Sequence, residues 1–119
     1  MKNKNLEKSD PETHKVWTSI AKNYSMIEGA QLSNSFIILM VLDKFKEPIS
    51  TTDISRMISL YSGGQIYKLA STLKDSLEHR LKREGYVEGL NLNNKSLSSI
   101  TPKGKKLLEG WLAFLEAFA

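Results

Sequence analysis

The stretch LEHRLKREGYVEGLNLNNKSLSSITPKGKKLL (residues 77–108) holds the clearest structural signals in this chain of 119 residues. Its hydrophobic period changes after Gly85, from the helical spacing of leucines to the alternation of a strand. Residues 86–92 and 95–100 predict two strands, and Asn93-Asn94 predicts a tight turn between them, because asparagine tolerates positive φ. The stretch therefore predicts a helix that ends at Gly85 and a β-hairpin that follows it.

A last helix is predicted over residues 102–118. Thr101 is suited to cap it, and Pro102 is suited to its first position, because proline lacks the N–H that would be left unpaired there. The helix is strongly amphipathic, with apolar residues at Leu107, Leu108, Trp111, Leu112, Leu115 and Phe118.

Upstream of Gly85, the spacing predicts a long helix from about Gln65 to Arg83. Ser62-Gly63-Gly64 breaks the chain before it, since two glycines permit backbone angles that other residues avoid. A short helix precedes this break, and Ser50-Thr51-Thr52-Asp53 resembles its capping sequence. The apolar stripe of the long helix is Ile66, Leu69, Ala70, Leu73, Leu77 and Leu81, and that of the short helix is Ile54, Met57 and Ile58.

Two further elements are predicted nearer the amino terminus. Residues 32–45 are apolar all round at their centre, so periodicity does not separate a buried helix from a strand, but their length favours a helix. Pro48 ends that element, and Ile49 reads as a short extended link. A helix is expected over residues 10–29, after a disordered polar tail at residues 1–9.

This order of elements predicts a mainly α fold with a small β-hairpin, namely a winged helix-turn-helix with added amino- and carboxy-terminal helices. Residues 10–119 make one domain, because a single hydrophobic core typically serves about 100–150 residues. The helices at 10–29 and 102–118 are expected to be its dimerisation helices.

Residues 77–88 and Ile100-Thr101-Pro102-Lys103-Gly104 resemble the winged helix-turn-helix transcriptional regulators of the MarR and PadR type. The resemblance covers about residues 32–110, and it implies a dimeric DNA-binding protein. Between Ile54 and Leu77 the chain is about two helical turns longer than the usual MarR arrangement. Either the helix after Gly64 is extended, or the preceding helix and turn are irregular.

The positive charge lies in the carboxy-terminal half. Residues 64–106 contain nine basic and four acidic residues, a net charge of +5, while the rest of the chain has a net charge of −1. This asymmetry suggests an anionic partner on that side, although a solvated charged surface would give the same count.

The polar face of the predicted long helix supplies the candidate contacts to double-stranded DNA. Gln65 is suited to adenine and Lys68 to guanine, and the other members are suited to bases or phosphates. The alternative is an ordinary solvated face. Asp75 repels phosphate, and it fits only by accepting from cytosine or by pairing with Lys68. The predicted DNA-binding residues are Gln65, Tyr67, Lys68, Ser71, Thr72 and Lys74, with Asn94 and Lys95 at the tip of the wing.

A homodimer is expected because the last helix ends with too much apolar surface for a small monomer. The alternative is that both terminal helices fold back onto their own core. The predicted interface residues are Trp17, Ile20, Tyr24, Trp111, Leu115 and Phe118.

No catalytic site, metal site or cofactor is expected. The chain has no cysteine, and His14 and His79 lack a metal-ligand spacing. The longest apolar run, residues 36–42, is far short of the ~20 residues that span a membrane, and a cytoplasmic location is expected.

Three functional hypotheses remain. The favoured one is a sequence-specific regulator that binds DNA as a dimer. The second is a winged-helix adaptor that binds proteins and makes no contact with DNA. The third adds a small-molecule effector to the first, in a pocket between the dimer helices and the winged helix.

Overall fold

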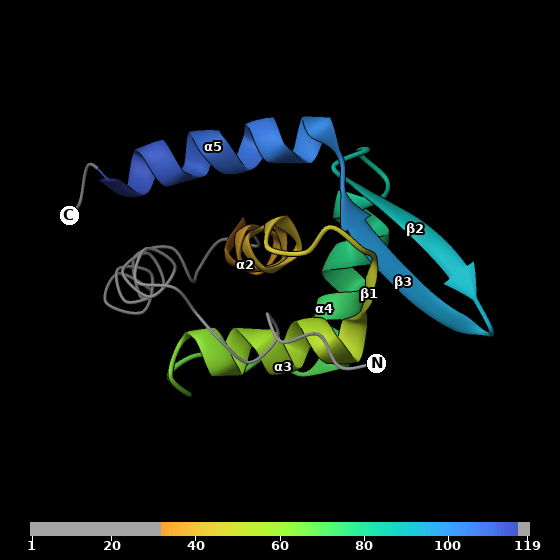
Figure 1. Ribbon diagram of the computed structural model, residues 1–119. Coiled ribbons are helices and arrows are strands. Elements are labelled where there is room, and N and C mark those ends of the chain that lie inside the picture. Colours follow the sequence, from red (N-terminus) through yellow and green to blue (C-terminus); the bar gives the residue numbers. More distant parts are fainter. Residues whose placement is uncertain (1–31, 117–119) are drawn as a thin grey trace.

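The computed structural model describes residues 32–116, apart from the side chains of Leu32, Ser33 and Leu115. Within this range, four helices pack beside a three-stranded antiparallel sheet of order β1-β3-β2 (Figure 1). The prediction of a mainly helical fold with a small hairpin is confirmed at that level. The predicted tail at 1–9, the helix at 10–29 and the end of the last helix lie outside the described residues. The elements are α2 (Leu32–Asp43), β1 (Ile49–Ser50), α3 (Thr51–Tyr61), α4 (Ala70–Ser76), the π-helical turn η2 (Leu77–Leu81), β2 (Val87–Leu92), β3 (Lys95–Ile100) and α5 (Pro102–Glu116).

The helix α2 forms the centre of the molecule. Every residue from Phe36 to Leu42 is buried, so this helix is apolar on all sides. Figure 1 shows it end-on between α3 and α5, with α4 beside it, and it contacts all three helices as well as β3. The prediction of a buried helix here is confirmed.

The helix α3 begins as its capping sequence predicts. The Ser50 hydroxyl accepts a hydrogen bond from the Asp53 backbone N–H at 3.1 Å, which satisfies one of the N–H groups left open at a helix start. Ile54, Met57 and Ile58 are buried against the core, as expected from their spacing.

Ile49 is more than an extended link. It lies in β1, which pairs with β3 so that Ile49 is opposite Ser98. The hairpin strands pair from Val87–Ile100 to Leu92–Lys95. The turn between them has φ values of 51° at Asn93 and 65° at Asn94, which confirms the predicted two-residue turn.

The prediction of one helix from Gln65 to Arg83 is wrong at its start. The chain from Ser62 to Leu69 is an irregular connection, and α4 begins at Ala70. Leu69, expected in the apolar stripe, is extended and 56% exposed. The other leucines of the stripe, Leu73, Leu77 and Leu81, are buried as predicted. The irregular part of this region therefore lies in the connection before α4.

Polar side chains hold the start of α5 on the turn that follows η2. The Thr101 hydroxyl donates to the Gly85 carbonyl at 2.7 Å and accepts from the Gly104 N–H at 3.1 Å, which confirms Thr101 as the helix cap. The Lys103 ammonium donates to the Glu84 carbonyl at 2.7 Å and lies 4.8 Å from the centre of the Tyr86 ring. Gly104 lies so close to Tyr86 that a Cβ there would overlap the Tyr86 carbonyl oxygen.

Two glycines of α5 therefore give a matched pair of substitutions. We expect Gly104→Ala to lower the free energy of unfolding by about 1–3 kcal/mol or more, because backbone has to shift to admit the methyl group. Gly110→Ala, where nothing lies within 4 Å, is expected to raise it by roughly 0.8–1 kcal/mol through helix propensity. Urea unfolding followed by circular dichroism measures both. Equal effects of the two substitutions would contradict the close contact at Gly104.

Candidate nucleic-acid interface

Two buried serines fix the connection between α3 and α4. The Ser62 hydroxyl accepts from the Ile66 N–H at 2.9 Å and lies 3.2 Å from the Ile66 carbonyl oxygen. The Ser55 hydroxyl, on the inner side of α3, donates to the Lys68 carbonyl at 2.6 Å. Ile66 itself is buried. These contacts hold both ends of the connection on the core and set the position where α4 starts.

The same contacts explain why the helix does not begin at Gln65. Side-chain hydrogen bonds to the backbone compete with helical ones, and Ser62 and Ser55 take up backbone groups of Ile66 and Lys68. Gly63 and Gly64 enter the connection with φ of +65° and +81°, which only glycine adopts readily. The predicted break at these glycines is confirmed.

The predicted DNA-binding residues consequently fall into three groups. Gln65, Tyr67 and Lys68 lie in the connection and not on a helix, which corrects their predicted placement. Tyr67 is 65% exposed. Ser71, Thr72 and Lys74 are exposed on α4, and Asn94 and Lys95 are exposed at the hairpin tip.

The outward face of α4 lies opposite its buried leucines. It carries Ser71, Thr72, Asp75 and, in η2, His79, all of them exposed. The Asp75 carboxylate oxygen Oδ1 lies 3.5 Å from His79 Nε2, one turn further along the helix. His79 is thus the ion-pair partner of Asp75, at the i,i+4 spacing that brings side chains together on a helix.

Lys82 lies to one side of this outward face. Its ammonium contacts Glu78 Oε2 at 2.7 Å, and its side chain is only 17% exposed. The side chain passes over Gly89 of β2, where a Cβ would lie 3.0 Å from Nζ. Lys82 therefore contacts both the end of the helix and the hairpin.

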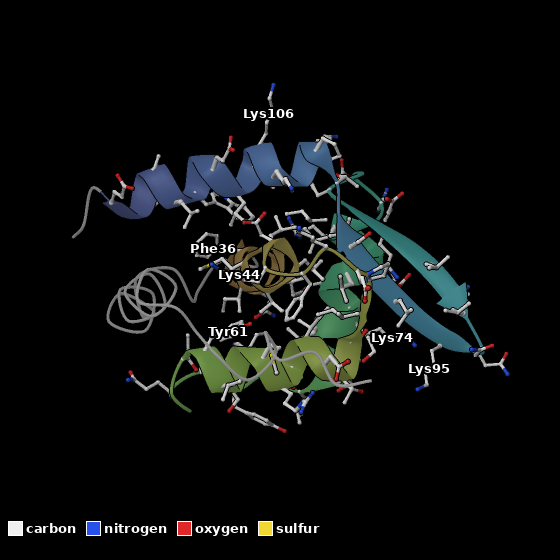
Figure 2. All side chains as sticks on the ribbon, viewed as in Figure 1. Phe36, Lys44, Tyr61, Lys74, Lys95 and Lys106 are labelled. Carbon is white, nitrogen blue, oxygen red and sulfur yellow. The ribbon has the colours of Figure 1, made fainter. Side chains whose placement is uncertain are left out.

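Two lysines are positioned at the hairpin end of the molecule. Figure 2 shows Lys74 and Lys95 on the side from which the hairpin projects, whereas Lys106 points away from the opposite edge. Lys103 is held by Glu84 and Tyr86 at the start of α5. Lys74 and Lys95 are thus two exposed cations on the hairpin side of the molecule.

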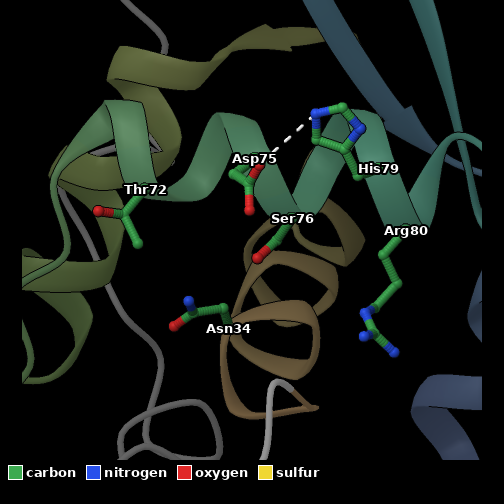
Figure 3. A pocket seen from close by; sticks show the side chains of 6 residues that line it. All are labelled: Asn34, Thr72, Asp75, Ser76, His79 and Arg80. Carbon is green, nitrogen blue, oxygen red and sulfur yellow. Dashed lines mark ion pairs between the residues drawn. The ribbon is translucent and has the colours of Figure 1, made fainter.

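A polar hollow of about 380 Å³ lies beside α4, on the flank that faces α2 (Figure 3). Asn34 faces it from α2, and the other lining residues are Thr72, Asp75, Ser76, His79 and Arg80. Thr72 and Asp75 therefore border both the outward face of α4 and this hollow.

A second hollow of about 550 Å³ lies between α2, η2 and α5. Its lining includes Trp111, Tyr86 and Arg83. Ser35 also lines it, and its hydroxyl is buried without a hydrogen-bond partner among the described residues. The effector pocket of the third hypothesis lies between the dimer helices and the winged helix, and the first of these dimer helices, at 10–29, is outside the described residues.

Only Trp111 of the predicted dimer residues is described with its side chain. It is half-buried and packs edge-on against Phe36 of α2, with ring centres 5.4 Å apart. Phe114, one turn further along α5, is 55% exposed. The remaining predicted interface residues lie outside the described side chains: Trp17, Ile20, Tyr24, Leu115 and Phe118.

No cluster of three or more His, Asp or Glu side chains that could hold a metal ion occurs between residues 32 and 116. In the same range no helix has both the length and the apolar character to span a bilayer.

Comparisons of the chain with known protein families, with curated proteins and with solved structures find no significant match.

Ser62 offers a direct test of how the connection is held. We expect Ser62→Ala to lower the free energy of unfolding by about 1–3 kcal/mol, because the buried Ile66 N–H loses its acceptor. The control Ser96→Ala alters an exposed serine of β3 and should change stability by less than about 0.5 kcal/mol. Urea unfolding of both variants is the measurement. A Ser62→Ala protein as stable as the control would show that the hydroxyl does not anchor the connection.

Proposed function

We propose that this chain is a winged helix-turn-helix transcriptional regulator that binds double-stranded DNA. The order α2-β1-α3-α4-β2-β3, with a short first strand paired to the hairpin, supports the winged-helix assignment. In this proposal α3 and α4 are the helix-turn-helix, and the hairpin β2–β3 is the wing. It agrees with the resemblance to MarR and PadR regulators in residues 77–108.

The observation that carries the proposal is the exposed polar surface shared by α4 and the wing. Ser71, Thr72 and Lys74 lie in the amino-terminal half of the helical segment formed by α4 and η2 (residues 70–81), and the amino-terminal half of a recognition helix is the part that meets base edges. Lys95 lies at the tip of the wing on the same side of the molecule as Lys74 (Figure 2). We assign α4 to the major groove and the wing tip to the backbone or the minor groove.

The connection before α4 adds to this surface. Gln65 and Tyr67 are exposed just ahead of the helix, and Lys68 is half-exposed. Placed in the connection, they approach the duplex beside the recognition helix and so suit the sugar-phosphate backbone better than base edges.

A homodimer completes the proposal. Phe114 is 55% exposed near the end of α5, and apolar residues precede and follow it in the sequence. A twofold pair joined by the terminal helices would present two copies of α4 to half-sites about one DNA turn apart.

An effector site is the third part of this proposal. The hollow between α2, η2 and α5 combines aromatic walls with the buried Ser35 hydroxyl, which has no hydrogen-bond partner in the described part of the chain. A small molecule with a hydrogen-bonding group would satisfy that hydroxyl.

The adaptor remains the second candidate, and one observation favours it. The exposed surface of α4 and η2 carries two carboxylates, Asp75 and Glu78, beside two cations, Lys74 and Arg80. A surface of mixed charge suits a protein partner better than a row of phosphates.

Duplex binding across a salt series separates the two candidates. A dimer that contacts about six phosphates should lose affinity with a log–log slope near −5. We expect Lys74→Ala to make the slope less negative by about 2 for the dimer, since one phosphate contact is lost in each protomer. Lys106→Ala, on the opposite edge, is the matched control and should leave the slope unchanged. An affinity for duplex DNA that does not change with salt, or an equal effect of both substitutions on the slope, would favour the adaptor.

The dimer is tested by sedimentation equilibrium at micromolar concentration. We expect the mass of two chains for the native protein and of one chain for Phe114→Glu, because a charge buried at the contact has no partner. Trp111 is unsuitable for this test, since it packs on Phe36 within the core. Glu109→Gln, an exposed change on α5, should leave the dimer intact. A native protein that sediments as a monomer would remove the dimer from the proposal.

A further inference from the structure

The outward face of α4 has an acidic residue at its centre. Asp75 lies two residues, or about 200° around the helix, from the buried Leu73. Its side chain is 78% exposed, so the carboxylate is open to solvent. Thr72 and His79 share this face one turn before and one turn after it. A helix placed in the major groove with this face inward would bring the Asp75 carboxylate to the base edges.

A carboxylate at that place is selective because it only accepts hydrogen bonds. The major-groove edges of guanine and thymine offer acceptors, which repel it. Donors come from the N4 amino group of cytosine and the N6 amino group of adenine, and adenine places its N7 acceptor beside that donor. Cytosine is therefore the base whose own edge opposes Asp75 least.

His79 strengthens this assignment by positioning the carboxylate. Its Nε2 lies 3.5 Å from Oδ1, and a carboxylate has a second oxygen that can accept from a base. Figure 3 shows the imidazole and the carboxylate joined along the same side of the helix. A hydrogen bond from His79 would favour this rotamer of Asp75, so that less conformational freedom would be lost when DNA binds.

We infer that Asp75 is a specificity-determining residue, which requires a cytosine at one position of each DNA half-site by accepting from its N4 amino group. This inference rests on the proposed function. The carboxylate would bind cytosine and also reject guanine and thymine, because these two bases would face it with hydrogen-bond acceptors at that position. Binding strength would come from the lysines and base choice partly from Asp75.

The test is selection of bound duplexes from a randomised pool, followed by sequencing, with the full chain and three variants. The native protein should enrich cytosine at one position of each half-site. Asp75→Ala should lose that preference, and the ratio of affinities for cytosine over the other bases at that position should fall by about 5- to 150-fold per half-site. Asp75→Asn should shift the preference toward adenine, whose N6 and N7 match an amide. Glu78→Ala is the matched control, because Glu78 is a carboxylate of the same helical segment that is engaged by Lys82.

The outcomes separate this inference from the function on which it rests. If the native protein selects a sequence and Asp75→Ala retains the cytosine preference, the inference is wrong and the regulator proposal stands. The same holds if Glu78→Ala loses the preference as fully as Asp75→Ala does. If none of the four proteins binds duplex DNA, both are overturned. Since Asp75 is exposed and contacts only His79 among the described ion pairs, its variants should unfold within about 0.5 kcal/mol of the native protein, which urea titration checks.

Discussion

The complete burial of α2 is the constraint on which the rest of the structure depends. A helix that is apolar on every side has no face to offer to water, so it needs neighbours all around it. Ile37, Leu39 and Val41 are fully buried, and fully burying one such side chain contributes about 1.5–3 kcal/mol. The helices α3, α4 and α5 and the strand β3 all pack against α2. The surfaces of α4 and α5 that are proposed to bind DNA and a second protomer are the outer sides of helices held in this way.

Polar contacts then convert this apolar packing into a defined surface. Ser55 and Ser62 fix the chain just before α4, and Thr101 and Lys103 fix the start of α5 on the turn that follows η2. Each of these side chains bonds a backbone group and none adds much to the apolar core. Their effect is to set where the exposed residues of α4 lie relative to the hairpin.

Local chemistry explains which parts of the fold the sequence could predict. Asn93-Asn94 and Thr101-Pro102 specify a turn and a helix start within a few residues, and both predictions are confirmed. The start of α4 could not be predicted in this way, because the Lys68 carbonyl is bonded by Ser55, thirteen residues earlier. The sequence offered two signals of this connection. Ser55 lies between the apolar residues of α3, and Ser62 lies just before the two glycines. For the site, the positions of Ser71, Thr72, Lys74, Asn94 and Lys95 agree with the predicted exposure, whereas Gln65, Tyr67 and Lys68 do not lie on a helix. Helical spacing also placed Leu69 in the core, although spacing alone carries no information on where a helix begins.

The absence of a side chain at Gly104 has a mechanical consequence. It lets the first turn of α5 rest directly on the backbone of Tyr86, where Thr101 and Lys103 also grip the neighbouring carbonyls. With no side chain between them, the two segments form a rigid contact. A tilt of α5 would therefore displace the start of the hairpin and the end of the helix before it.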